Sequence, residues 1–439
     1  MRKIISIFAV VLSIAMMFSA CGGGKPAPAS GNSSPDASVS PVASESQKAP
    51  TKENVTITYL TGIPLYAKNG ADINAEFQKT NPNITVKIEH VSDNYEAVLK
   101  TKLVTENPPD IFNWQGYLAM KPFVEGGQVV SLDGTGIEAM LYPNFVESGK
   151  MDGKFYGVPT QIQTIGLLYN KDVFKKAGIN EVPKTVSALK EAVTKINAIG
   201  VQPFASGLKE QWVCYDLFWF AQSPHVGDML SWNNDMNAGK GTFMNDNMPA
   251  MFELFDFIYA NSGSKAMSSD FAEMCHQIAS GTAAMGIQGD WSYEETMKID
   301  PNANVGMIGL PIDENAENAT VLADVAEVLY VSSASKNQEA AQTFIKWILS
   351  KEGATFLGAM TKTPSPSNAK PDIELNPFAR DGSQWVADGK KTAIFAWDYW
   401  APGIMDIAGK NLQAYFTKAM TLEELVADLD AQWAKTIKK

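Results

Sequence analysis

Residues that bind transition metals are scarce in this 439-residue sequence, which contains three histidines and three cysteines. The histidines, His90, His225 and His276, are far apart, and no two have the spacing of metal ligands. The sequence therefore predicts no metal site, and nothing in it indicates a bound cofactor. Two of the cysteines, Cys214 and Cys275, lie in apolar or amphipathic helical patterns. We expect two buried thiols, with a disulfide between them as the alternative.

Basic residues are also sparse, since 36 Lys and Arg stand against 48 Asp and Glu, for a net charge of -12 and a pI near 4.9. No run of Lys or Arg follows the N-terminus. This charge pattern argues against a nucleic-acid partner. No tandem repeat and no hydrolase motif is present. What the chain does have is aromatic residues, with 21 Phe, 13 Tyr and 10 Trp, and enough apolar residues for a large core and two lobes.

The N-terminus has the features of an export signal over residues 1–20. Two basic residues precede an apolar stretch, residues 4–18, which has the length of a signal peptide and is short for a membrane-spanning helix. The small residues before Cys21 resemble the lipobox of bacterial lipoproteins, although Phe18 stands where Leu is usual. The resemblance implies that Cys21 is diacylated and becomes the new N-terminus. An ordinary cleaved signal with an incidental cysteine is the alternative.

The next segment, residues 21–54, is rich in Ser, Pro, Ala and Gly and contains no aromatic residue. Such a composition cannot bury enough apolar surface to fold, so we expect a disordered tether. A flexible chain of this length spans roughly 30 Å. A tether this long suits a Gram-positive surface lipoprotein better than a periplasmic protein.

Beyond the tether, hydrophobic periodicity predicts strands that alternate with helices, which is typical of an open α/β sheet. Ligands bind to such sheets beyond the carboxyl ends of the strands. The expected strands cover 55–60, 84–91, 108–114, 166–170 and 282–289. The expected helices cover 70–82, 94–106, 171–179, 182–200, 215–222, 248–261, 269–281, 336–357 and 421–437.

Several stretches, in this order, resemble the extracellular solute-binding proteins of bacterial ABC importers, and specifically the maltose-binding-protein-like family 1 of sugar binders. They include "PPDIFNWQGY", "DGKFYGVPTQIQTIGLLYNKDVFKKAGI", "VPKTVSALKEAVTKI", "IASGTAAMGIQGDW", "SASKNQEAAQTFIKWILSKEG" and "MTLEELVADLDAQW". Each is weak alone, but together they span almost all of residues 55–439. The resemblance implies a protein without catalytic activity.

The resemblance also implies a two-lobed periplasmic-binding-protein-like fold of type II, with a ligand between the lobes and closure on binding. The chain is expected to cross the hinge three times, near 162–166, 323–329 and 363–370. The expected lobes are 55–162 plus 326–363 for the N-terminal lobe and 166–323 plus 370–439 for the C-terminal lobe.

The partners implied by the resemblance are a carbohydrate ligand and the permease subunits of an ABC transporter. We expect a monomer at the extracellular face of the cytoplasmic membrane, held there through the lipid anchor only.

An acid and a tryptophan, Asp290 and Trp291, follow directly after an expected buried strand. A pyranose has an apolar C–H face, which an aromatic ring can cover, and a rim of hydroxyls, which acids and amides can bind. In the resembling family the tryptophan at this turn stacks on a sugar ring, so Trp291 is expected in the site. Asp290 stands where that family commonly has Pro, and it could bind hydroxyls or cap the next helix. Ser292 and Glu295 form a capping-box pattern, which leaves Asp290 available.

Further candidates come partly from the residues and partly from the resemblance. Gln161 and Gln163 share one side of a strand, where polar groups need partners. Asp324 and Glu327, at the second expected crossing, could contact ligand or fix the hinge. The resemblance adds the candidates Tyr66, Trp114, Glu210 and Trp212, and Trp400 as a substitute for a tryptophan that is not matched in this sequence.

Two other tryptophans fit a packing role better. Trp347 shares a helix face with Phe344, and Trp433 continues a leucine stripe. Two alternative functions stay open. A polyamine or polyol could bind an acidic, tryptophan-rich site through carboxylates and cation–π contacts. A secreted glycosidase would need two suitably spaced carboxylates, which the candidate acids could supply.

Overall fold

The computed structural model describes residues 53–91 and 95–437. The expected signal peptide, Cys21 and nearly all of the expected tether lie outside these residues. Within the described part of the chain, no helix is long and apolar enough to cross a membrane.

Nine strands of the described chain form one mixed sheet, in which the order of the main path is β2-β1-β3-β10-β6-β8-β7. β1 is parallel to β2 and β3, β7 is parallel to β8, and β10 runs antiparallel to both β3 and β6. Two short strands are attached to this path, since β9 pairs with β6 and β11 with β10. The path strands are β1 (Val55–Thr61), β2 (Ile84–His90), β3 (Ile111–Trp114), β6 (Gly157–Asn170), β7 (Gln202–Phe204), β8 (Ala283–Gly289) and β10 (Val321–Val331); the attached strands are β9 (Val305–Ile308) and β11 (Thr392–Ala393).

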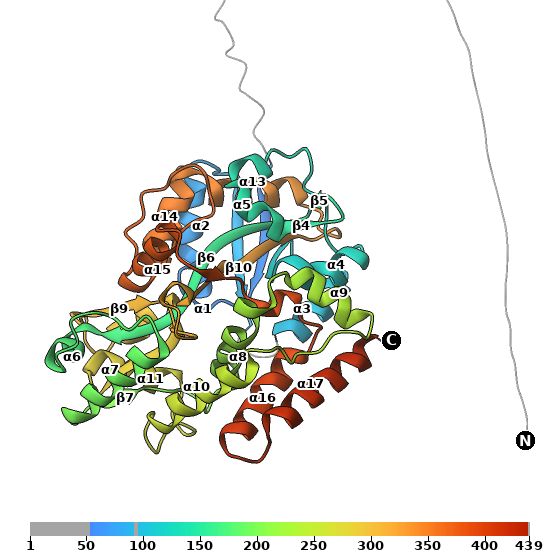
Figure 1. Cartoon of the computed structure of the whole chain (residues 1–439). Helices are drawn as coiled ribbons and strands as arrows, with labels where there is room; N and C mark the ends of the chain where they lie inside the picture. The colour runs from blue at the N-terminus through green and yellow to red at the C-terminus, as the bar shows by residue number, and fades with distance from the viewer. Residues whose placement is uncertain (1–52, 92–94, 438–439) are drawn as a thin grey trace, which may run out of the picture. The chain divides into compact units, whose positions relative to one another are not determined.

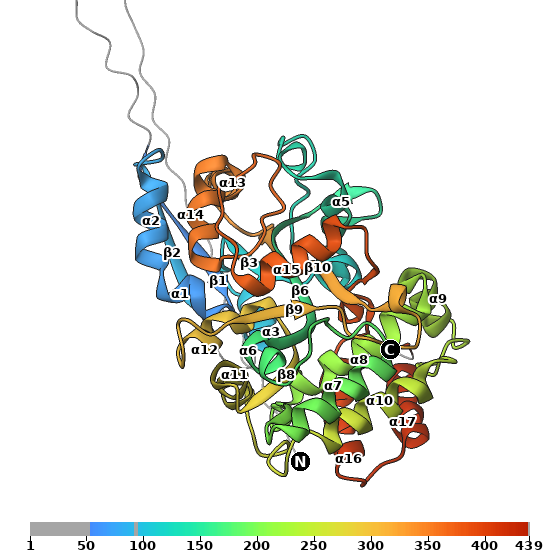
Figure 2. The same ribbon diagram turned by 60° about the vertical axis from the view of Figure 1, so that its left-hand side comes forward.

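The long strands β6 and β10 form the middle of this sheet and run through the centre of the views in Figures 1 and 2. The predicted strand over 166–170 is confirmed as the last part of β6, which begins earlier than expected and is 14 residues long. Its first part pairs with β10, and from Ile165 onward it also pairs with β8. The strand pairing of β6 therefore continues without interruption through residues 162–166. The register of β6 with β10 shifts between Val325 and Val328, where the pairing is irregular.

Buried apolar side chains gather in clusters on either side of the β6–β10 pair. Two clusters draw their residues from 55–158 and 325–360, which we call the β1–β3 side. Two others draw mainly from 165–322 and 378–433, which we call the β7–β8 side. The boundaries of the two lobes stay a prediction.

Most predicted helices are present, and their ends follow from local capping chemistry. α11 begins after Asp270, whose carboxylate accepts a hydrogen bond from the Glu273 amide, and it ends at Gly281 in the left-handed conformation. α7 begins after Thr185, whose hydroxyl accepts from the Ala188 amide. The longer helices are α2 (Gly70–Gln78), α3 (Tyr95–Leu103), α7 (Val186–Ala198), α8 (Gln211–Val226), α9 (Met229–Asn237), α10 (Met248–Ala260), α11 (Phe271–Ser280), α13 (Gln338–Leu349), α14 (Lys351–Thr361), α15 (Pro377–Ala387), α16 (Ile404–Phe416) and α17 (Leu422–Ile437). Shorter ones are α1 (Pro64–Lys68), α4 (Lys121–Glu125), α5 (Pro143–Val146), α6 (Lys171–Lys176) and α12 (Tyr293–Met297), with the 3-10 turns η1 (Tyr117–Met120), η4 (Asp290–Ser292) and η6 (Ala396–Tyr399).

The prediction of one helix over 336–357 was wrong, because Ser350 divides it into α13 and α14. Ser350 is extended (φ -67°, ψ 160°), and its hydroxyl oxygen accepts a hydrogen bond from the Gly353 amide at 3.1 Å. A Cβ atom on Gly353 would lie 2.0 Å from the carbonyl oxygen of Trp347. Serine capping and this close backbone approach therefore end one helix and begin the next.

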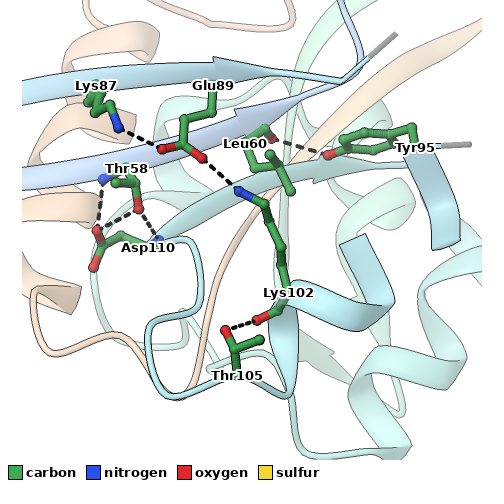
Figure 3. A network of polar contacts seen from close by, with 8 residues as sticks. All are labelled: Thr58, Leu60, Lys87, Glu89, Tyr95, Lys102, Thr105 and Asp110. Carbon is green, nitrogen blue, oxygen red and sulfur yellow. Dashed lines mark hydrogen bonds and ion pairs between the residues drawn. The ribbon is translucent and has the colours of Figure 1, made fainter. Parts of the chain in front are cut away.

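Side-chain hydrogen bonds hold the strands of the β1–β3 side in register, as Figure 3 shows. Asp110, just before β3, accepts from the amide and hydroxyl of Thr58 on β1, at 2.7 and 3.1 Å. Glu89 on β2 lies between the ammonium groups of Lys87 and Lys102. The hydroxyl of Tyr95 donates to the carbonyl of Leu60 at 3.1 Å. These contacts fix α3 and Tyr95 against the carboxyl ends of β1 and β3.

Candidate ligand-binding site

The β6–β10 pairing brings four of the predicted site residues together. In the register of the two strands, Asp324 is opposite Gln163 and Glu327 is opposite Gln161. Directly opposed residues in an antiparallel pair lie on the same face of the sheet. Two glutamines on β6 therefore lie opposite two acidic residues on β10, in the middle of the sheet.

Asp324 links this strand pair to turns from both sides. It is 5% exposed, and its carboxylate accepts hydrogen bonds from the Tyr117 hydroxyl at 2.9 Å and the Phe395 amide at 3.2 Å. The ring of Tyr117 stacks on that of Tyr399 at 5.4 Å. Burial raises the pKa of Asp324 to about 6. Since Tyr117 belongs to η1 and Tyr399 to η6, the contact joins the β1–β3 side to the segment that precedes α16.

Tyr117 holds an unusual backbone conformation, with φ at 48°. A bulky residue rarely adopts the left-handed region, and strain of this kind gathers at functional sites. Tyr117 was not among the site residues predicted from the sequence, although it lies in the resembling stretch "PPDIFNWQGY".

Glu327 belongs to a second polar group, at the end of β3. Its carboxylate accepts from the side-chain amide of Asn113 at 2.5 Å. Asn113 in turn accepts from the amide of Gly62 through its side chain and from the Tyr95 hydroxyl through its carbonyl. Burial raises the pKa of Glu327 to about 7. Asn113 and Tyr95 were missed in the sequence analysis, and the polar Asn inside the apolar strand "DIFNW" was the available signal.

Gln161 and Tyr66 lie together on the other flank of β6. The Gln161 side chain donates to the Thr363 hydroxyl at 2.9 Å. Both Gln161 and Tyr66 line a small cavity of about 20 Å³ between β6 and α14, which is the size of one water molecule. Tyr66 is buried, and its ring centroid lies 5.9 Å from that of Tyr59.

Asp290 is fully buried at the end of β8. One carboxylate oxygen accepts from both the amide and the hydroxyl of Thr164 on β6, each at 2.9 Å. The other oxygen has no hydrogen-bond partner among the described residues. Burial raises the pKa of Asp290 to about 7.

The predicted capping box at Ser292 and Glu295 was wrong. The Ser292 hydroxyl donates to the carbonyl of Gly289 at 2.6 Å, and α12 begins without a side-chain cap. Glu295 instead contacts His276 and Lys298. The reason is that the chain first makes the 3-10 turn η4, which places Ser292 in a helical conformation rather than the extended one of an N-cap.

Trp291 lies back over the end of its own strand. A Cβ atom on Gly289 would be 2.1 Å from the Trp291 ring, so the indole packs directly on the glycine backbone. Trp291 is half-buried against the large cluster of the β7–β8 side.

Glu210 and Trp212 lie at the start of α8 and contact the start of α11. The Glu210 carboxylate accepts from the amide of Phe271 at 3.0 Å, and the Trp212 ring lies 5.0 Å from that of Phe271. The structure places this pair in contact with α11 rather than with the acids on β10.

The remaining two predicted residues, Trp114 and Trp400, line a pocket of about 530 Å³. Residues of α3, η1 and α4 form one wall, and residues of α9, η6, α16 and α17 form the other. Trp114 is half-buried and stacks on Tyr95 at 6.2 Å, and its indole N–H donates to the carbonyl of Ala119. Trp400 is 6% exposed, and its N–H donates to the side chain of Gln222 at 2.8 Å.

The same pocket is lined by Trp397 and Trp433, and by Asn233, Asn234 and Asn237 of α9. Trp397 precedes Asp398, which is 1% exposed and accepts from the Trp397 N–H at 3.1 Å. Burial, and then the nearby Asp324 carboxylate, raise the pKa of Asp398 above its usual range. The pocket therefore borders the Tyr117–Asp324–Tyr399 contact.

The structure confirms several packing predictions. Trp347 and Trp433 are buried, at 5% and 1% exposure. Trp347 stacks on Phe344 with ring centroids 5.7 Å apart. Cys214 and Cys275 are both buried free thiols, and burial raises the pKa of each to about 12.

The family model of the bacterial extracellular solute-binding proteins matches residues 66–355. The chain belongs to this family. Solute-binding proteins of this family act outside the cytoplasm, secreted or associated with the membrane.

Two relatives of this solute-binding protein have named ligands. The Multiple sugar-binding protein of Streptococcus mutans is 24% identical over 320 residues, which is 69% of this chain and 73% of that protein. The Melibiose/raffinose/stachyose-binding protein MelE of Bacillus subtilis is 22% identical over 346 residues, which is 76% of this chain and 78% of that protein.

Solved structures show the fold. A chitin oligosaccharide binding protein superimposes with a TM-score of 0.76 at 19% identity, over 88% of this chain and all of the other. A binding protein, RafE, in complex with raffinose gives a TM-score of 0.73 at 20% identity, again over 88% of this chain and all of the other. This solute-binding protein therefore has the mixed α/β fold of type II periplasmic binding proteins, as the sequence predicted.

Proposed function

We propose that this solute-binding protein captures a carbohydrate outside the cell and delivers it to the permease subunits of an ABC importer. It acts as a monomer and catalyses no reaction. The observation that carries the proposal is the pocket of about 530 Å³ whose walls come from both sides of the β6–β10 pair.

The chemistry of the pocket suits a sugar ring. The indole rings of Trp114 and Trp397 offer apolar faces for C–H groups, and the exposed side-chain amide of Asn234 offers donors and an acceptor for hydroxyls. The amides of Asn233 and Asn237 line the same pocket and are hydrogen-bonded to each other. Ligand pockets combine apolar walls with a few polar groups in the same way, and about 530 Å³ lies within their usual size.

The charges around the pocket favour a neutral ligand over a polyamine. Three acidic side chains, Glu96, Glu125 and Asp406, and two basic ones, Lys100 and Lys121, line it. A polycation would be attracted by an excess of acids and repelled by the lysines. The near balance of charge leaves the aromatic faces and the amides as the main recognition elements. The names of the relatives, which are sugar-binding proteins, support the same choice.

We place the other predicted residues in a continuous ligand region along the β6–β10 pair. Asp290, Trp291, Glu210 and Trp212 form its β7–β8 wall, and the acids on β10 with Gln161, Gln163 and Tyr66 form its floor. Ligand contacts to both sides exist only when the two lobes are closed, so binding favours closure.

The test is titration calorimetry of the purified protein with raffinose, maltotriose and a chitin oligosaccharide, and with spermidine as the cationic alternative. For the sugar that binds, Trp114→Ala and Trp397→Ala should each weaken affinity by at least about 30-fold, because a buried aromatic contact is worth roughly 2 kcal/mol or more. Trp385→Ala is the matched control, since Trp385 on α15 does not line the pocket and should leave affinity unchanged. Binding of spermidine alone would reject the carbohydrate proposal.

Two further parts of the proposal have separate tests. Lipid anchoring at Cys21 predicts that Cys21→Ala moves the protein out of the detergent phase in a phase-partition assay, whereas equal partition would reject the anchor. The absence of catalysis predicts no new reducing ends when the protein is incubated with the bound oligosaccharide.

A further inference from the structure

One face of α8 carries buried polar atoms that have no partner. Asp216, Trp219 and Ser223 are at positions i, i+3 and i+7, which share a helix face. Gln222 lies beside them. Each is at most 7% exposed. Among the described residues, one carboxylate oxygen of Asp216, the indole N–H of Trp219, the amide nitrogen of Gln222 and the hydroxyl of Ser223 make no hydrogen bond.

Such a set is unusual inside a protein, because nearly all buried polar groups are hydrogen-bonded and an unmade bond is costly. The unpartnered atoms of Trp219, Gln222 and Ser223, along one side of the helix, therefore call for a partner from outside the fold. Phe218 and Phe220 of the same helix are fully buried. His225, near the end of the helix, has a ring nitrogen that also makes no hydrogen bond within the described residues. We call Asp216, Trp219, Gln222 and Ser223 the polar row.

The polar row adjoins the pocket of about 530 Å³ through two tryptophans. Trp219 packs against Trp397 with ring centroids 5.1 Å apart, and the Gln222 side-chain oxygen accepts from Trp400 at 2.8 Å. Trp397 and Trp400 both line the pocket. On its other side, the Asp216 carboxylate lies beside the side-chain amide of Gln288 on β8, a donor that acts against the rise in the pKa of Asp216. The row therefore lies between the pocket and the end of β8.

The unpartnered atoms include both donors and acceptors. The Trp219 and Gln222 nitrogens can only donate, the Asp216 carboxylate accepts, and the Ser223 hydroxyl does both. A cation would need acceptors only and an anion donors only. A hydroxyl group both donates and accepts, so a ring that carries several hydroxyls matches the mixed set.

We infer that the polar row of α8 is an inner subsite that binds the hydroxyl groups of a neutral polyhydroxylated ring, which enters from the side of Trp397 and Trp400. The inference rests on the proposed carbohydrate function and goes further, because it assigns specificity to four residues that neither the sequence patterns nor the pocket lining indicated. A site built to bind hydroxyls rejects analogues that lack them. The subsite therefore selects sugars by the hydroxyl pattern of one terminal ring.

The test compares two buried serines. The Ser223 hydroxyl has no hydrogen-bond partner in the part of the chain that the structure describes, whereas the Ser262 hydroxyl donates to the carbonyl of Ile258 at 2.8 Å. Wild type, Ser223→Ala, Trp219→Phe and Ser262→Ala are titrated with raffinose and with maltotriose by calorimetry, and each is melted without sugar. The inference expects Ser223→Ala and Trp219→Phe to weaken binding of the recognised sugar by at least about tenfold, and the ligand-free melting temperature of Ser223→Ala to be equal to or above that of wild type. Ser262→Ala should show the reverse pattern, with a lower melting temperature and unchanged affinity.

The outcomes separate this inference from the proposed function. Unchanged sugar affinity in Ser223→Ala and Trp219→Phe would overturn the subsite and leave carbohydrate capture standing. A melting temperature of Ser223→Ala that falls as far as that of Ser262→Ala would also overturn it, because the row would then be satisfied internally, for example by buried water. If wild type binds neither sugar, the function fails in this assay, and the ligand-free melts still decide whether the row belongs to the fold.

Discussion

Replacing Asp290 by Asn changes how the stability of the protein depends on pH. Asp290 is fully buried, and one of its carboxylate oxygens accepts hydrogen bonds from the amide and hydroxyl of Thr164. Burial raises the pKa of Asp290 from 3.8 to about 7. The native protein therefore favours the neutral acid, whereas the unfolded chain ionises it near its ordinary pKa. The contribution of this group to stability is fully present below about pH 4 and is lost as the pH rises toward 7.

The size of the change in stability with pH follows from the shift in the pKa of Asp290. About three pKa units, at about 1.36 kcal/mol each, amount to roughly 4 kcal/mol between pH 4 and pH 7. Asparagine keeps an oxygen that can accept from Thr164 and never ionises. The free energy of unfolding of Asp290→Asn should therefore exceed that of wild type by an amount that grows with pH and levels off above about pH 7.

Urea unfolding of both proteins without ligand, at several pH values from 4 to 8.5, measures this difference. The exposed Asp246→Asn is the control and should follow wild type at every pH. Thr164→Val removes one donor, so it should raise the pKa of Asp290 further and extend the loss of stability to higher pH. A constant difference between wild type and Asp290→Asn across the pH range would refute the reasoning.

Three other predictions concern packing and hydrogen bonding. Trp347→Ala should lose ~3–5 kcal/mol of stability and keep its affinity for sugar. Trp291→Ala should bind sugar at least about 30-fold more weakly, with little change in melting temperature. The opposite pattern would show that Trp291 is the packing residue and Trp347 the binding residue. Tyr117→Phe removes the donor at 2.9 Å from Asp324, so it should raise the pKa of Asp324 and destabilise the protein more at pH 8 than at pH 5, as urea unfolding will show. In a Cys21→Ala variant, the two buried thiols should react with Ellman's reagent at pH 8 only after unfolding, and fast reaction of the native variant would contradict their burial.

The parts of the fold that the sequence predicted are those with local causes. The ends of α11 follow from Asp270 and Gly281, both next to the helix that they limit. The length of β6 was not predictable in this way, because the strand is held by pairing with β10, which is distant in the chain. The break at Ser350 had a local signal, a serine three residues before a glycine, but the apolar periodicity on both sides hid it.

The site likewise combines residues that could be selected from local sequence with contacts that only the folded chain reveals. Gln161 and Gln163 could be selected because they are two residues apart on one strand, and Asp324 and Glu327 because they lie at the second expected hinge crossing. What could not be predicted is their partners. Tyr117 contacts Asp324 across 207 residues of sequence, so only the folded chain reveals the hydrogen bond.

The raised pKa values of the acids near the β6–β10 pair bear on the function of the protein. Asp290, Asp324, Glu327 and Asp398 all have pKa values raised by burial, so each lowers stability at neutral pH. A fold that needed only stability would be better served by neutral residues at these positions. Their concentration where the sheet passes between its two sides, next to a tryptophan-lined pocket, is the arrangement expected of a binding site. A sugar hydroxyl that donates to such a carboxylate replaces the water lost on burial. Bound ligand therefore offsets part of the free energy that the ligand-free protein loses by burying these acids.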